Sequence, residues 1–86
     1  MPKITATPDP VSAGHNLQIC YTFGANQTGV SLTVRYSTPN DGDVVIGIEL
    51  TPANPCYDRH VPSNCTGVLI SDDSGAAEDL AVTVTP

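Results

Sequence analysis

The sequence predicts an all-β domain, a single antiparallel sandwich of seven strands occupying residues 1–86. Val, Ile and Thr supply 24 of the 86 residues, and their β-branched side chains suit a pleated sheet better than a helix. Eight prolines recur along the chain, and each of them would interrupt or bound a helix. Between these breaks, apolar and polar residues alternate with the period of two that indicates a strand.

Seven segments show this alternation, separated by turns rich in Pro, Gly, Asn and Asp. The expected strands cover residues 3–7, 16–23, 30–37, 44–50, 56–61, 68–70 and 80–84. The side chains expected to face the core are Ile4, Ala6, Leu17, Ile19, Tyr21, Phe23, Val30, Leu32, Val34, Tyr36, Val44, Ile46, Ile48, Leu50, Val68, Ile70, Leu80, Val82 and Val84. Segment 56–61 is less regular because Arg59 shares the parity of Tyr57 and Val61. A bulge or an edge position would resolve this conflict.

The charge balance excludes two classes of partner. Nine acidic residues stand against three basic ones, for a net charge of -6. Binding to nucleic acid requires a basic patch that displaces counterions from phosphates, and three scattered bases do not form one. The same deficit argues against an anionic membrane surface. No apolar run approaches the ~20 residues of a membrane span.

Two stretches of the chain have a recognisable order of turn and strand residues. The first runs from Pro8 to Gly14 and continues through 17–23, and the second covers 68–85 with its Asp-Ser-Gly turn. Both resemble extracellular immunoglobulin-like modules, with bacterial cell-adhesion-related domains and fibronectin type III-like repeats as the nearest comparison. The resemblance implies an immunoglobulin-like β-sandwich. The chain departs from true immunoglobulin domains, since it has no Trp and no Tyr two residues before its second Cys. No functional residue is therefore carried over.

The three cysteines allow several arrangements. In this sandwich topology the second and fifth strands are antiparallel neighbours, so Cys20 and Cys56 can form a cross-strand disulfide. That bridge would leave Cys65 as a free thiol or as the site of an intermolecular bridge. The alternatives are a Cys56–Cys65 bridge, which closes a short loop, and three reduced thiols.

Acidic residues gather in two turns, at Asp41 and Asp43 and at Asp72 and Asp73. Carboxylates in loops are the ligands that calcium prefers. Asp is equally an ordinary turn residue, and no known calcium-loop spacing is present. Calcium therefore stays a candidate ligand beside the simpler interpretation of solvated turns.

Five further residues are candidates for modification or for metal binding. Asn26 and Asn64 begin N-glycosylation sequons in expected loops. Pairing of the second and fifth strands would bring His60 beside Asn16 and near His15, and with Asp58 these histidines would offer ligands to a transition metal. Surface histidines are the simpler interpretation of this pair.

The sequence predicts a non-catalytic extracellular or cell-surface module that serves in adhesion, protein binding or spacing, as one domain of a longer chain. No nucleophile elbow, phosphate loop or metalloprotease helix is present. The alternatives are a small calcium- or carbohydrate-binding protein and, further behind, a metal- or thiol-dependent enzyme. A cytosolic location is the alternative because no signal-peptide pattern follows Met1.

Two kinds of surface are expected to bind such a module's partner, whose identity the sequence does not give. Loops on a rigid scaffold vary without disturbing the core, which favours residues 24–29, 52–55 and 72–79. An open sheet edge presents unpaired backbone groups. A homodimer formed through an edge strand or through Cys65 is therefore a second expectation.

Overall fold

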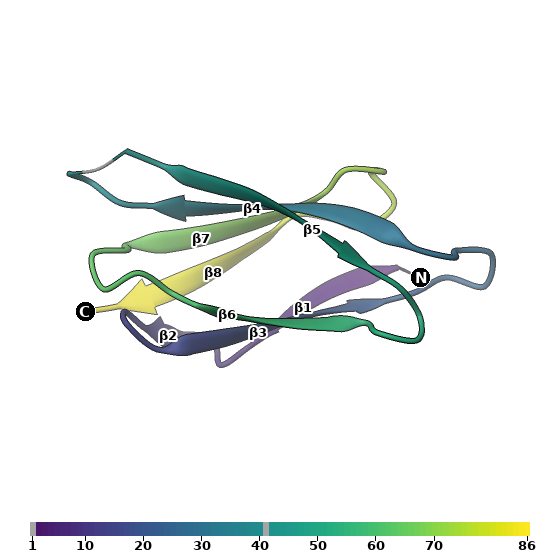
Figure 1. Cartoon of the computed structure of the whole chain (residues 1–86), viewed down its shortest axis with the longest axis horizontal. Coiled ribbons are helices and arrows are strands. Elements are labelled where there is room, and N and C mark those ends of the chain that lie inside the picture. Colours follow the sequence, from purple (N-terminus) through teal and green to yellow (C-terminus); the bar gives the residue numbers. More distant parts are fainter. Residues whose placement is uncertain (1, 41) are drawn as a thin grey trace.

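The computed structural model describes residues 2–40 and 42–86, and its fold is all-β, as predicted (Figure 1). The strands are β1 (Lys3–Thr7), β2 (Val11–Ser12), β3 (Asn16–Thr22), β4 (Val30–Ser37), β5 (Val44–Leu50), β6 (Cys56–His60), β7 (Gly67–Asp72) and β8 (Leu80–Thr85). No helix in these residues is long and apolar enough to cross a membrane.

The strands form two sheets, as in the predicted sandwich, but the described residues form eight strands and one pair of them is parallel, which corrects the prediction of seven antiparallel strands. A three-stranded sheet has the order β1-β3-β6, and a curled five-stranded sheet has the order β2-β8-β7-β4-β5. The strand that the sequence did not predict is β2, which pairs parallel to β8 with Val11 opposite Val84. The segment Pro8-Asp9-Pro10 ends β1, because proline cannot donate to a ladder, and the chain then crosses to the other sheet.

Most of the side chains expected to face inward are buried. The buried apolar cluster consists of Ile4, Val11, Leu17, Ile19, Tyr21, Val30, Leu32, Val34, Tyr36, Ile48, Leu50, Val61, Cys65, Val68, Ile70, Ala77, Val82 and Val84. Ala6, Phe23, Ile46 and Leu80 are only partly buried and pack against this cluster. Val44 is a wrong prediction, since its side chain is 39% exposed. It begins β5, which lies at the edge of the wider sheet, where the narrower sheet does not cover it.

Arg59 lies on an edge strand, which is one of the two arrangements predicted to allow a charged residue on the same face as Tyr57 and Val61. β6 is the outer strand of the three-stranded sheet, so its backbone has one open side. The guanidinium carbon of Arg59 lies 6.0 Å from the centre of the Tyr36 ring. The cation thus covers an aromatic face while its charged end stays near solvent.

Replacing Tyr36 with phenylalanine should leave the free energy of unfolding unchanged or raise it by about 1 kcal/mol. The Tyr36 side chain is fully buried, and its hydroxyl makes no hydrogen bond of regular geometry among the described residues, with only a weak side-chain interaction from Arg59. Burial raises the pKa of this hydroxyl, and nearby Arg59 opposes the rise. Urea denaturation would measure the effect. Tyr21→Phe is the matched control, because that hydroxyl is hydrogen-bonded and its loss should destabilise the fold; a clear loss of stability in Tyr36→Phe would contradict the prediction.

Candidate functional site

Three connecting loops lie at one end of the molecule. They are residues 23–29 between β3 and β4, 51–55 between β5 and β6, and 73–79 between β7 and β8, on the right of Figure 1. These are the loops that the sequence singled out, so the fold places all three expected binding segments together.

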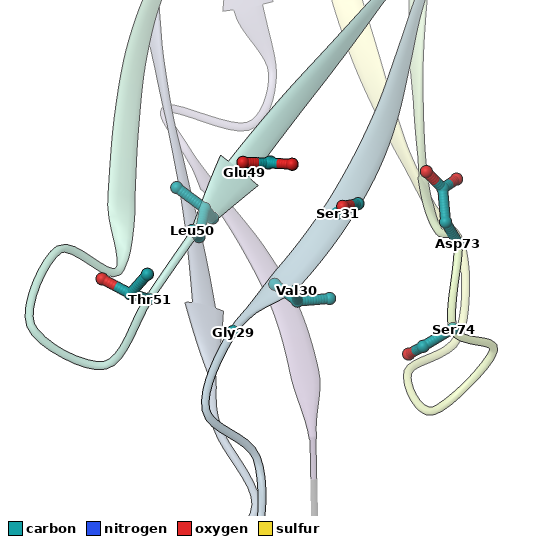
Figure 2. Close-up of a pocket in the computed structure, with 8 residues that line it drawn as sticks. All are labelled: Gly29, Val30, Ser31, Glu49, Leu50, Thr51, Asp73 and Ser74. Atoms are coloured by element: carbon teal, nitrogen blue, oxygen red, sulfur yellow. The ribbon is translucent and has the colours of Figure 1, made fainter.

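A shallow groove of about 450 Å³ lies at this end of the five-stranded sheet, between β4, β5 and the start of loop 73–79 (Figure 2). Ser31 stands between the carboxylates of Glu49 and Asp73. Register explains this arrangement, since Ser31 pairs with Glu49 and the Asp73 amide donates to the Ser31 carbonyl at 3.0 Å. A second hollow of about 540 Å³ continues over Gly47. The described lining of both hollows carries acidic and hydroxyl side chains but no basic one.

Asp72 lies buried beneath this groove and organises loop 73–79. Its Oδ1 accepts hydrogen bonds from the Ser74 amide at 2.8 Å and the Ser74 hydroxyl at 2.6 Å. Its Oδ2 accepts from the Tyr21 hydroxyl at 2.7 Å and from the Ala77 amide at 3.0 Å. Gly75 takes a φ of 77°, which glycine adopts without strain. Each carboxylate oxygen therefore receives two donors, which fills its accepting capacity.

The same network extends to loop 23–29 through Tyr21. The side-chain Nε2 of Gln27 donates to the Tyr21 hydroxyl at 3.0 Å, and the side-chain Oε1 of Gln27 accepts from the Gly24 backbone amide at 2.7 Å. The loop between β3 and β4 and the loop between β7 and β8 are thus joined through one buried carboxylate. This arrangement holds both loops in a defined conformation.

The network shifts the pKa values of both buried groups. Burial by itself would raise the pKa of Asp72, but hydrogen bonds from Ser74, Tyr21 and the Ala77 amide outweigh it and lower the pKa below its ordinary value. The pKa of Tyr21 is raised by burial and by its hydrogen bond to Asp72. At neutral pH the site therefore holds an ionised carboxylate that accepts from a neutral phenol.

The structure does not bring the candidate calcium ligands together. Asp43 lies beside Arg35, with 3.9 Å between the carboxylate and guanidinium groups, in the turn at the opposite end from Asp72. Asp73 is exposed and its carboxylate accepts from the Thr33 hydroxyl at 2.7 Å. Asp41 is outside the described residues. Within residues 2–40 and 42–86, no group of three or more His, Cys, Asp or Glu side chains could hold a metal ion.

The predicted neighbours of the second and fifth strands are confirmed. Asn16 faces His60 in register, and the Nδ1 atom of His60 lies 3.3 Å from the Asn16 amide oxygen. Asp58 faces Gln18 on the same pair of strands. His60, Asn16 and Asp58 therefore lie on a regular pair of strands, and the described part of the chain holds no metal site that includes them.

Cys20 and Cys56 face each other on β3 and β6 and form a disulfide, as the first of the cysteine arrangements predicted. The bridge joins the two strands directly beneath loop 51–55. Cys65 is a free, buried cysteine whose thiol donates to the Gly67 carbonyl at 3.1 Å. A bridge between copies through Cys65 would require this region to open.

Both sequon asparagines, Asn26 and Asn64, lie exposed in loops, so glycosylation stays a prediction.

Sequence reasoning missed the structural role of Asp72. One signal was present, because Asp72 shares the parity of Val68 and Ile70 on its strand. An acid in line with core residues, two positions before a serine, is typical of a buried acceptor in an Asx turn.

No protein-family model, curated protein or solved structure matches this chain.

Proposed function

We propose that this chain is a non-catalytic immunoglobulin-like module of the cell surface or the extracellular space that binds a protein partner through its loop end. Two features support the immunoglobulin-like assignment: two packed sheets, and a β3–β6 pair in the position of neighbouring strands of that sandwich. The Cys20–Cys56 disulfide supports an oxidising environment.

The observation that carries the binding proposal is the buried Asp72 network. Because Asp72 and Tyr21 fix two loops on the core, these loops lose little conformational entropy when they bind. The disulfide holds the third loop at its root. Rigid loops on a stable scaffold are typical of binding sites.

The charge of the loop end favours a basic partner surface. The groove carries Glu49 and Asp73, and the chain as a whole has a net charge of -6. Complementary charge increases association rates and excludes partners of like charge. A lysine- or arginine-rich segment that also donates to Ser31 and Thr51 matches this lining.

Photo-crosslinking would test the loop end as the binding site. We expect a photoreactive residue at Ala76, which is exposed in loop 73–79, to capture a discrete partner from cell-surface extract of the source organism, with capture blocked by excess unlabelled protein. The matched control is the same residue at exposed Ser63, in the loop between β6 and β7 at the opposite end. Equal capture at both positions would contradict the proposal. A thermal shift with calcium that Asp73→Asn abolishes would replace it with ion binding.

A further inference from the structure

The four outer strand edges of the two sheets differ in how they are protected. β1 and β6 are the edges of one sheet, and β2 and β5 are the edges of the other. β1 carries Lys3 and ends directly before Pro8, and β6 carries Asp58 and Arg59. β2 has only two residues. Charges, prolines and short length are the means by which proteins prevent edge-to-edge pairing.

β5 has none of these protections in its first five residues. It is seven residues long, and 44–48 contain neither a charge nor a proline. Val44 and Val45, on opposite faces of the strand, are 39% and 51% exposed. Long, apolar and open edge strands are templates for pairing with another chain.

Gly47, at the middle of the exposed part of β5, has no role in the packing of its own chain. A Cβ atom at this position would meet no described atom within 4 Å, and Gly47 does not have a positive φ. Glycine inside a strand weakens it, and it often marks the close approach of another backbone. Glycine at this exposed position leaves the outer face of β5 without a side chain, which lets another strand approach closely.

We propose that two copies of this chain pair through their β5 edges, antiparallel, with Gly47 opposite Gly47. This register places Ile46 opposite Ile48 on the inner face, and it continues each five-stranded sheet into the other. On the outer face it places Val45 opposite Glu49. The β5 edge adjoins the groove at the loop end, since Gly47 and Glu49 line its second hollow, but the dimer does not depend on the proposed binding function.

Charge complementarity selects this register. Arg35 lies beside Val45 on the neighbouring strand, and its half-exposed side chain, 3.9 Å from the Asp43 carboxylate, keeps further donors open to solvent. In the paired state, Arg35, Val45 and Glu49 of the other copy lie in one row across three adjacent strands, with Val45 in the middle. The empty position at Gly47 leaves room for these long side chains to meet. Each dimer therefore gains two symmetric contacts between Arg35 and Glu49.

The neighbouring register is less favourable. With Ile46 opposite Ile46, Asp43 of one copy would face Glu49 of the other. Like charges placed directly opposite each other destabilise a strand pair. Pairing about Gly47 instead places Asp43 opposite Thr51.

Charge substitutions at the β5 edge test both the surface and the register. Sedimentation equilibrium over a series from micromolar to millimolar protein should show a weak dimer for the unmodified chain. Val45→Glu should weaken dimerisation about tenfold or more, because it creates two like-charge pairs with Glu49. The double variant V45E/E49K should restore dimerisation, because the new lysine faces the new glutamate of the other copy.

The control is Ala81→Glu, a change at another exposed position of the same sheet but on β8, which should alter dimerisation less than about twofold. Circular dichroism melts establish that each variant is folded. The proposal is overturned if the unmodified chain is monomeric throughout, or if Val45→Glu has no more effect than Ala81→Glu. Failure of V45E/E49K to restore the dimer, with all variants folded, would overturn the Gly47 register.

Discussion

Replacing both Cys20 and Cys56 with serine should lower the free energy of unfolding by about 3–4 kcal/mol. The bridge joins residues that are 36 positions apart, and removing it lets the unfolded chain sample far more conformations. A domain of this size buries a smaller fraction of its surface on folding than a large domain does, so its total stability is modest. The double variant should therefore be largely unfolded at temperatures where the parent is folded.

Urea denaturation of the parent, of Cys20→Ser/Cys56→Ser and of Cys65→Ala would measure this effect. Cys65→Ala keeps the disulfide and removes one buried sulfur and its hydrogen bond to Gly67, so it should cost only about 1 kcal/mol. A loss below that of Cys65→Ala in the double variant would show that the bridge contributes little. Reduced parent protein should behave like the double variant.

The alternation of residues predicted most of the fold because one face of each sheet is buried. Leu17, Ile19 and Tyr21 are buried as expected, and a shift of one residue would expose all three. Pairing of the second and fifth strands then followed from the sandwich topology, and it placed Cys20 opposite Cys56. Local pattern and global topology agree at this point.

Other features depend on contacts that periodicity does not encode. β2 has two residues, too few for any alternation to be visible, and its parallel pairing depends on where the chain re-enters the fold. The exposure of Val44 depends on the widths of the two sheets, which a strand's own sequence does not specify. At the loop end, Tyr21 and Asp72 meet from distant strands. The loops were predictable from their turn residues, and the network that holds them was not.

Asp72→Asn should lower the free energy of unfolding at neutral pH by about 2–4 kcal/mol. An amide nitrogen in place of one carboxylate oxygen cannot accept hydrogen bonds. At least one pair of donors, either the Ser74 amide and hydroxyl or the Tyr21 hydroxyl and Ala77 amide, would lose its acceptor. Asp73→Asn is the matched control: Asp73 is exposed and accepts one described hydrogen bond, from Thr33, so its replacement should cost below about 1 kcal/mol.

The pH dependence of the free energy of unfolding separates the contribution of the Asp72 charge from the contribution of its side-chain shape. Because the folded state lowers the pKa of Asp72, the ionised carboxylate stabilises the fold above the unfolded pKa of about 4. This contribution is lost as the pH falls through the folded pKa. The stability difference between the parent and Asp72→Asn should therefore be constant near neutrality and should shrink below about pH 4.

Denaturation curves of the parent, Asp72→Asn and Asp73→Asn from neutral to acidic pH would measure this difference, and a gap that stays constant down to the lowest pH would show that the charge of Asp72 does not stabilise the fold. Hydrogen exchange adds a local test. The Ala77 and Gly24 amides depend on Asp72 directly and through Tyr21 and Gln27, so both should exchange faster in Asp72→Asn. If Ala77 alone responds, Asp72 holds loop 73–79 but does not order loop 23–29. A response at both amides would establish that one buried carboxylate orders two of the three loops of the proposed binding surface.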